Sequence, residues 1–347
     1  MRRFSKVLWI GDVPVGGGNP IIVQSMTRSS PADHERCIRE IKELADEGAR
    51  IIRVAVPDRE ACENLPKIIK ASPVPIIADI HFDHRLAIGA LRAGVHGLRI
   101  NPGNIRERDK VREIVKEAKE RGVPIRIGVN AGSLPQDIDE SLPLHERMVE
   151  AAMREIKFLE ELSFDLVKIS LKAFDIRATV EATRRIAELT PYPIHIGITE
   201  AGTPYSGIIR SAIGIGILLY EGIGDTIRVS LTTKDGREEV RAGYEILKSL
   251  SLLEEGPVLV SCPSCGRAEV DIVGLAEEVD KYLRGIKKKI KVAVMGCVVN
   301  GPGEARDADV GIACGRGKGV IFKKGKILKT VPEGEFFKVL KEEIDKL

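Results

Sequence analysis

Three cysteines near the C-terminus have the spacing of metal ligands. Cys262 and Cys265 form a C-x-x-C hook, and Cys297 stands in the later string Met295–Glu304. Glycines and prolines surround all three and let the backbone turn tightly around a bulky group. Iron–sulfur clusters normally take four cysteines, so three thiols predict a cluster with one unusual corner. Glu304, in the same Gly-Pro-Gly loop as Cys297, is the candidate for that corner.

A structural zinc site is the alternative interpretation of these cysteines. Zinc prefers a closed tetrahedral set of ligands, usually built from two paired hooks. Cys297 has no C-x-x-C partner, so the second hook is missing. Cys314 would complete a set of four cysteines, and zinc therefore stays open beside the cluster.

The composition of the chain is that of a globular enzyme. It has 347 residues, 43% of them hydrophobic and 30% charged, which is enough for one large and one smaller domain. A net charge of +3 gives no global sign of nucleic-acid or membrane binding. We expect no secretory signal and no membrane span. Six cysteines in such a chain predict a reducing cytoplasm, where thiols serve metals or catalysis.

Short strands alternate with amphipathic helices from residue 20 to about residue 250. The candidate strands are Ile21–Ser25, Ile51–Ala55, Pro75–Asp79, Gly97–Ile100, Ile125–Val129, Leu166–Ser170, Ile194–Ile198 and Thr226–Ser230. The candidate helices lie near 33–48, 58–71, 83–93, 105–121, 144–162, 174–189, 206–221 and 236–250. Eight such units predict an α/β fold of the (β/α)8 TIM-barrel type, with an open doubly wound sheet as the alternative.

A basic residue stands between apolar residues in six of these strands. The six are Arg53, Arg99, Arg126, Lys168, His195 and Arg228. Side chains alternate across a strand, so we expect each of them to point into the barrel. Buried cations are costly unless they are paired, and Asp79 or Glu200 could pair with two or three of them. For the rest we expect a polyanionic ligand at the C-terminal mouth, where the active sites of such barrels lie.

More polar residues follow at the strand ends: Asn101, Asn130, Ser170, Lys172, Thr199, Glu200 and Ser230. Asn and Ser side chains can donate hydrogen bonds to phosphate or sugar oxygens. Glu200 is a candidate acid or base, or alternatively a salt-bridge partner of Arg228. The spacing of Asp79 and His81 suggests a hydrogen-bonded pair.

A second domain is predicted after the barrel, because Glu254–Pro257 has the composition of a linker. We predict a substrate-binding barrel at residues 1–254 and a small α+β domain that holds the cluster at residues 255–347. Gly315–Gly319 resembles a phosphate loop in composition, but between two short strands it is predicted to be a hairpin turn.

The topology of the barrel predicts a dimer. The last helix of a (β/α)8 barrel runs away from the mouth, so the chain leaves opposite the active site. A linker of about seven residues reaches at most ~25 Å, which is too short for a comfortable path around a barrel. The second domain is therefore expected to cap the barrel of a partner subunit in a closed twofold dimer.

Several strings resemble one enzyme family. Ser261–Arg267 and Met295–Glu304 resemble the signature of the bacterial 4-hydroxy-3-methylbut-2-enyl diphosphate synthases, which are iron–sulfur enzymes of the non-mevalonate isoprenoid pathway. The barrel strings that are similar to this family, in its order, are Val23–Thr27, Ala78–His81, Arg99–Asn104, Gly128–Ser133 and Gly197–Gly202. The resemblance covers nearly the whole chain. One departure is Arg28–Ser30, where many members carry Asn-Thr.

The resemblance implies an activity and a set of partners. The reaction would be the two-electron reductive ring opening of 2-C-methyl-D-erythritol 2,4-cyclodiphosphate to 4-hydroxy-3-methylbut-2-enyl diphosphate, with loss of water. Flavodoxin or ferredoxin would deliver the electrons. The fold would be a pterin-synthase-like barrel with a ferredoxin-like cluster domain, assembled as a homodimer.

The resemblance also implies the site residues. A [4Fe–4S] cluster would be held by Cys262, Cys265, Cys297 and Glu304. The diphosphate would be bound by Arg53, Arg99, Arg126, Asn130, Lys172, Arg228 and Ser230. Glu200 would be the acid of the barrel, and could donate the proton that lets an oxygen leave as water. A carboxylate is a harder and more labile iron ligand than a thiolate, so Glu304 could give way to a substrate oxygen. Lys168 and His195 follow only from the strand pattern.

Two other functions are alternatives. A pterin-dependent synthase or methyltransferase would share the barrel and its anionic ligand, but would leave the cysteines idle. A cluster carrier or a zinc-stabilised binding protein would leave the interior cations unexplained.

Overall fold

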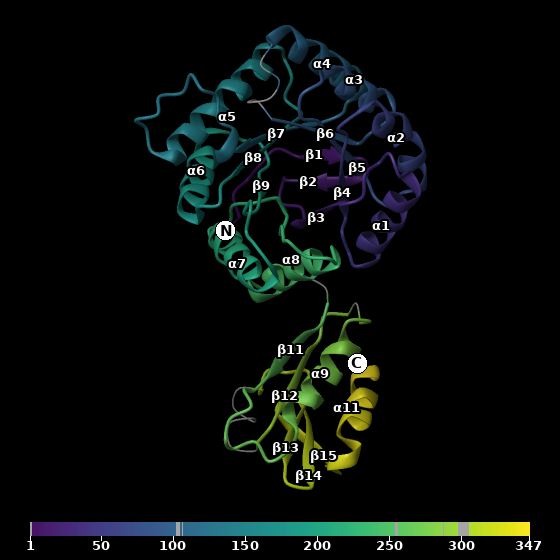
Figure 1. The fold of residues 1–347 in the computed structure, drawn as a ribbon. Helices are drawn as coiled ribbons and strands as arrows, with labels where there is room; N and C mark the ends of the chain where they lie inside the picture. The colour runs from purple at the N-terminus through teal and green to yellow at the C-terminus, as the bar shows by residue number, and fades with distance from the viewer. Residues whose placement is uncertain (1, 102–104, 106, 254–255, 287, 298–304) are drawn as a thin grey trace. The chain divides into compact units, whose positions relative to one another are not determined.

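The computed structural model of the chain describes residues 2–101, 105, 107–253, 256–286, 288–297 and 305–347. It divides into two compact units, Met1–Leu252 and Leu253–Leu347 (Figure 1). The predicted boundary between residues 254 and 255 lies outside the described residues. None of the described helices is long and apolar enough to cross a bilayer.

The first unit is a barrel of parallel strands. They are β3 (Ile22–Met26), β4 (Ile51–Ala55), β5 (Ile76–Asp79), β6 (Gly97–Ile100), β7 (Ile125–Asn130), β8 (Val167–Lys172), β9 (His195–Ile196) and β10 (Thr226–Ile227). Their order in the sheet is β8-β7-β6-β5-β4-β3-β10-β9, and a bridge between Ile169 and Ile194 closes the ring. The predicted TIM barrel is confirmed, and the alternative of an open sheet is wrong.

Each barrel strand is followed by an outer helix (Figure 1). The helices are α1 (His34–Asp46), α2 (Arg59–Ala71), α3 (His84–Arg92), α4 (Arg108–Arg121), α5 (Leu144–Glu161), α6 (Ile176–Leu189), α7 (Pro204–Tyr220) and α8 (Arg237–Ser249), with a 3-10 turn η1 (Ala131–Ser133) after β7. The side chains of Asp33, Asp58 and Asp175 each accept a hydrogen bond from a backbone N–H three residues later. Such caps fix where the helices α1, α2 and α6 begin.

A short hairpin precedes the barrel and was not predicted from the sequence. β1 (Leu8–Ile10) and β2 (Val13–Val15) pair antiparallel, and in Figure 1 they lie within the ring of strands. Ile10, Val13 and Val15 form one buried cluster with Ile22, Ile51 and Ile77. The last three belong to the first half of their strands, so the hairpin closes the N-terminal end of the barrel with apolar side chains.

The second unit is built on one mixed sheet. Its strands are β11 (Val258–Ser261), β12 (Lys291–Met295), β13 (Val310–Gly315), β14 (Lys318–Lys323) and β15 (Lys326–Pro332), in that order across the sheet. β11, β12 and β13 run parallel, and β13, β14 and β15 antiparallel. Its described helices are α9 (Ile272–Leu283) and α11 (Phe336–Asp345), with a 3-10 turn η2 (Glu333–Glu335). The predicted α+β unit is confirmed, and Gly315–Gly319 is the predicted hairpin turn between β13 and β14.

Candidate active site

The basic residues predicted to face the barrel interior lie there. Arg99, Arg126 and Lys168 are cross-strand neighbours on β6, β7 and β8, and they are only 5%, 3% and 2% exposed. His195 on β9 is equally buried. Strict alternation of side chains along a strand therefore placed a layer of positive charge where barrels usually hold aliphatic residues.

Asp79 is the carboxylate at the centre of this layer. Its Oδ1 lies 3.0 Å from Nη1 of Arg99, and its Oδ2 lies 3.4 Å from Nε of Arg53. His81 Nε2 is 3.6 Å from the same Oδ2, which fits the predicted pairing of Asp79 with His81. Burial by itself raises the pKa of Asp79, but Arg53, His81 and Arg99 together hold that pKa well below its ordinary value. The predicted role of Asp79 as an internal counter-ion is confirmed.

The carboxylate beside Arg228 is Glu239, not Glu200. Glu239 Oε2 lies 3.6 Å from Nη2 of Arg228, and Glu239 Oε1 lies 3.3 Å from Nη2 of Arg28. The alternative of a salt bridge between Glu200 and Arg228 is therefore wrong. The sequence offered little signal for Glu239, because an acidic pair in the first turn of a helix is ordinary.

Some of the remaining basic side chains have hydrogen-bond partners among neighbouring side chains. Nη1 of Arg126 donates to Oγ of Ser170 at 2.6 Å. The Lys172 amine lies 3.2 Å from Nε2 of His195, and Nδ1 of His195 lies 2.8 Å from the hydroxyl of Thr226. Burial and the charge of Lys172 hold the pKa of His195 well below its ordinary value. A neutral imidazole that accepts from Lys172 and donates to Thr226 fits both contacts.

The interior still holds more positive than negative charge. In the part of the chain that the structure describes, Asp79 and Glu239 are the carboxylates that form ion pairs with this layer. The cations are Arg53, Arg99, Arg126, Lys168, Lys172 and Arg228. Four of their buried nitrogen atoms have no hydrogen-bond partner among the described residues: Nε of Arg99, Arg126 and Arg228, and Nζ of Lys168. Oxygen atoms of a polyanion are the partners that such donors bind best.

Two glycines make room for these side chains. A Cβ at Gly128 would lie 2.7 Å from Nε of Arg99, and a Cβ at Gly197 would lie 2.7 Å from the Lys172 amine and 2.4 Å from the carbonyl oxygen of Arg228. Any larger residue would displace a cation or the backbone. Gly128 and Gly197 are thus part of the site, although their positions in the sequence alone indicate no role for them.

Three other predicted residues follow the strands at the mouth of the barrel. Asn130 ends β7, where it is the cross-strand neighbour of Lys172. Ser230 follows β10 and is half-buried. Glu200 follows β9, is exposed, and has a φ of 55°. Non-glycine residues rarely adopt this left-handed conformation, which costs free energy and concentrates at functional sites.

Two of the cysteines predicted as metal ligands follow neighbouring parallel strands of the second unit. Cys262 directly follows β11, and Cys297 closely follows β12, its parallel neighbour. The N–H of Gly296 donates to Sγ of Cys262 at 3.0 Å, and hydrogen bonds from Arg267 lower the pKa of the exposed Cys265. Among the described residues, no three His, Cys, Asp or Glu side chains are gathered closely enough to hold a metal ion as they stand. Glu304 lies outside the described residues.

Cys314 belongs to the core of the second unit. It is 0% exposed and packs in the cluster that includes Ile312, Ile321 and Phe336. Burial, followed by the nearby Cys262, raises the pKa of Cys314 to about 12. A thiol in this environment behaves as a small hydrophobic residue and is a poor candidate for a metal thiolate.

Anion binding in the barrel should take up protons. Burial and the neighbouring Arg126 hold the pKa values of Lys168 and Lys172 well below their ordinary range. A bound anion favours the charged amines and raises both pKa values, so by linkage the affinity falls as pH rises. We expect the calorimetric heat of binding inorganic pyrophosphate to depend on the protonation enthalpy of the buffer. The Lys168→Met variant should take up fewer protons, and a buffer-independent heat would contradict this expectation.

The comparisons with known proteins cover both units. The family described as "GcpE TIM-barrel domain" matches residues 5–244, and the one described as "GcpE protein C-terminal domain" matches residues 258–346. Two curated relatives are named 4-hydroxy-3-methylbut-2-en-1-yl diphosphate synthase (flavodoxin). The protein from Dehalococcoides mccartyi (strain ATCC BAA-2100 / JCM 16839 / KCTC 5957 / BAV1) is 57% identical over 100% of this chain and 99% of its own length. The protein from Geobacter sulfurreducens is 54% identical with the same coverage.

Two solved structures are similar to this chain over about the length of the barrel. The type I 3-dehydroquinate dehydratase of Clostridium difficile has a TM-score of 0.52 at 16% identity, and covers 72% of this chain and 100% of that one. The dihydropteroate synthase of Yersinia pestis has a TM-score of 0.50 at 13% identity, and covers 71% of this chain and 98% of that one. These likenesses show the fold only, whereas the matches in sequence extend through both units. The chain therefore belongs to the GcpE family.

Proposed function

We propose that the protein is the synthase that its relatives are named for. It would open the ring of 2-C-methyl-D-erythritol 2,4-cyclodiphosphate and release 4-hydroxy-3-methylbut-2-enyl diphosphate and water, with two electrons from flavodoxin. The observation that carries this proposal is the surplus of buried cations in the barrel. A cyclic diphosphate is a compact polyanion and suits the planar donor forks of several arginines. The name of the two relatives supports flavodoxin over ferredoxin as the electron donor.

The diphosphate would be held by the residues that the family resemblance implies: Arg53, Arg99, Arg126, Asn130, Lys172, Arg228 and Ser230. The free Nε atoms of Arg99, Arg126 and Arg228 support this assignment. Lys168 belongs to the same layer, and its unpartnered amine supports adding it to the set.

A [4Fe–4S] cluster would be held by Cys262, Cys265, Cys297 and Glu304. The chemistry of the donor set fits, because Cys262 accepts a backbone N–H and Cys265 has a lowered pKa that favours the thiolate. When bound, such a cluster supplies electrons one at a time. Free thiols at all the cysteines support a reducing, cytoplasmic location.

Glu200 would supply the proton chemistry. Opening the ring breaks a carbon–oxygen bond and leaves that oxygen on the diphosphate, whereas a separate oxygen, the hydroxyl on C3, departs as water and needs a proton. Glu200 is an exposed carboxylic acid held in a strained backbone conformation after β9, which supports a functional role.

A homodimer would complete the site, with each cluster unit capping the barrel of its partner. The outer face of α7 supports self-association, because it exposes an apolar stripe of Tyr205, Ile209, Ile213, Ile217 and Tyr220. A groove of about 580 Å³ lies beside this stripe between α7 and α8. Exposed apolar surface of this extent on one helix is typical of an interface.

Metal analysis tests the cluster. Protein purified without oxygen should be brown and contain about four irons and four sulfides per chain, and the Cys297→Ala variant should lose most of both. Cys314→Ala should keep the full content, because Cys314 lies in the apolar core. One zinc per chain in a colourless protein would reject the cluster and the redox reaction with it.

Replacement of the proposed acid tests the role of Glu200. The Glu200→Gln variant keeps the size of the side chain, but its amide cannot act as a general acid. We expect its kcat with the cyclic diphosphate to fall by about 10²-fold or more, with iron content and KM little changed. Full turnover by Glu200→Gln would remove this role.

A charge on α7 tests the dimer. Ile213 is 48% exposed, so the Ile213→Asp variant should fold, but sedimentation should show monomers with little turnover. Leu189→Asp, at a comparably exposed position at the end of α6, is the control and should remain dimeric. A fully active Ile213→Asp monomer would contradict the shared site.

A further inference from the structure

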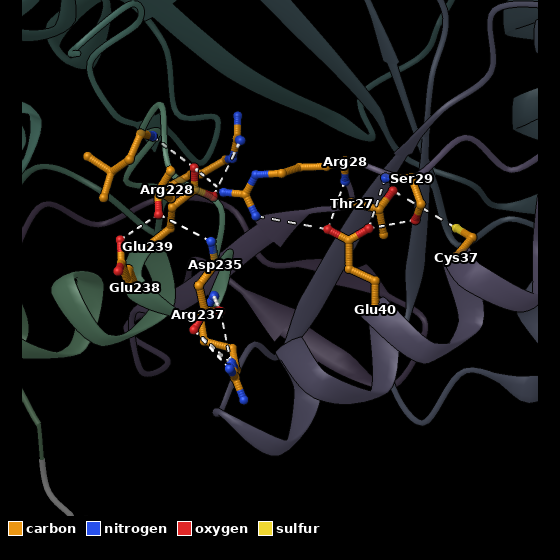
Figure 2. A network of polar contacts seen from close by, with 12 residues as sticks. Thr27, Arg28, Ser29, Cys37, Glu40, Arg228, Asp235, Arg237, Glu238 and Glu239 are labelled. Atoms are coloured by element: carbon orange, nitrogen blue, oxygen red, sulfur yellow. Dashed lines mark hydrogen bonds and ion pairs between the residues drawn. The ribbon is translucent and has the colours of Figure 1, made fainter. Parts of the chain in front are cut away.

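Glu239 is a buried carboxylate held between two arginines. It stands in the first turn of α8 and is 3% exposed. Its Oε1 accepts a hydrogen bond from the backbone N–H of Leu231 at 2.8 Å and lies 3.3 Å from Nη2 of Arg28. Its Oε2 lies 3.6 Å from Nη2 of Arg228. Figure 2 shows Glu239 beside Arg228 in this network.

Arg28 is fixed from its other side. The Glu40 carboxylate on α1 accepts hydrogen bonds from the backbone N–H groups of Arg28 and Ser29, both at 2.9 Å, and from the Ser29 hydroxyl at 2.5 Å (Figure 2). A Cβ at Gly236 would lie 2.3 Å from Nη1 of Arg28, so the guanidinium packs directly against that glycine. Both ends of the Arg28 residue are therefore held.

The contacts among Arg28, Glu239 and Arg228 connect the first strand of the barrel with the last one. Arg28 follows β3, the first barrel strand, while Arg228 and Leu231 follow β10, the last one. The ladder between β3 and β10 contains only two residue pairs. Side-chain contacts through Glu239 thus join two loops whose backbone pairing is short.

The charges of these residues determine how strongly Arg228 can attract an anionic ligand. Glu239 and Arg228 alone would form a neutral pair, and a neutral pair attracts a diphosphate weakly. Arg28 shares the Glu239 carboxylate and also lies 4.0 Å from Oε1 of Glu40, so Glu239 is divided between two arginines and neutralises Arg228 only in part. Nε of Arg228 also has no hydrogen-bond partner among the described residues, and it stays available for an anion.

We propose that Glu239 is a positioning residue that orients Arg228 toward the diphosphate, and that Arg28, by sharing the Glu239 carboxylate, leaves Arg228 more of its positive charge. The inference rests on the proposed function, because Arg228 is one of the proposed diphosphate ligands. It also gives a role to Arg28.

The sign of the effect of Glu239→Gln tests the proposal. Removal of a negative charge near the site would tighten anion binding if only net charge mattered. If Glu239 orients Arg228, the same change should instead weaken binding of the cyclic diphosphate about tenfold. Calorimetry on the cluster-containing protein gives Kd, and steady-state kinetics should show the change in KM with kcat little altered. A loss of folding alone would lower the active fraction and leave KM unchanged.

Arg28 provides a second and independent variant. Its side chain is 34% exposed, so the Arg28→Gln variant should fold. It should raise Kd about tenfold, while Arg28→Lys, which keeps the charge, should recover most of the affinity. Both residues act through Arg228, so their effects should not be additive. The double variant Arg28→Gln/Glu239→Gln should lose less binding free energy than the sum of the losses in the two single variants.

Glu238→Gln is the matched control. It makes the same charge change one residue away, where the carboxylate accepts from the Thr233 hydroxyl and not from Arg228, so Kd should stay within about twofold. Unchanged or tighter binding by Glu239→Gln would overturn the positioning role. Wild-type protein that failed to bind the cyclic diphosphate would reject the proposed function itself, and this inference with it.

Discussion

The structure depends on keeping surplus positive charge inside a closed barrel. Transfer of a cation from water to a protein interior is unfavourable, and a paired carboxylate offsets only part of that cost. Asp79 and Glu239 each face two arginines, so neither cancels the charge around it. Burial also depresses the pKa values of Lys168 and Lys172, which lets these amines shed charge when no anion is present.

This arrangement favours binding over stability. An aliphatic interior would contribute hydrophobic free energy at every one of these positions, whereas the cations leave donors without partners in the described part of the barrel. Proteins tolerate such local losses where function requires them. The apolar cluster under the charged layer and the capped helices outside it supply the compensating stability.

The sequence predicts the parts of this design that follow from local rules. Strand and helix periodicity identify the barrel, and alternation along β6, β7 and β8 alone places Arg99, Arg126 and Lys168 inside. Side-chain pairings that depend on closure of the ring cannot be predicted in this way. Glu239 meets Arg228 only because α8 packs beside β10, and nothing in the local sequence separates it from its neighbour Glu238.

Very short strands and close packing contacts also cannot be predicted from the local sequence pattern. Three-residue strands such as β1 and β2 are too brief to show a period of two, so the hairpin was not predicted. Gly128 and Gly197 were recognised only within strings typical of a family. Their physical role appears when the distance from each glycine to a neighbouring cation is known.

The hairpin at the N-terminal end has an electrostatic consequence. Ile10, Val13 and Val15 fill that end with apolar side chains. A low-dielectric floor directs the field lines of the cations toward the opposite, open end. The positive charge inside the barrel then attracts anions toward the open end from a distance, before they contact the site.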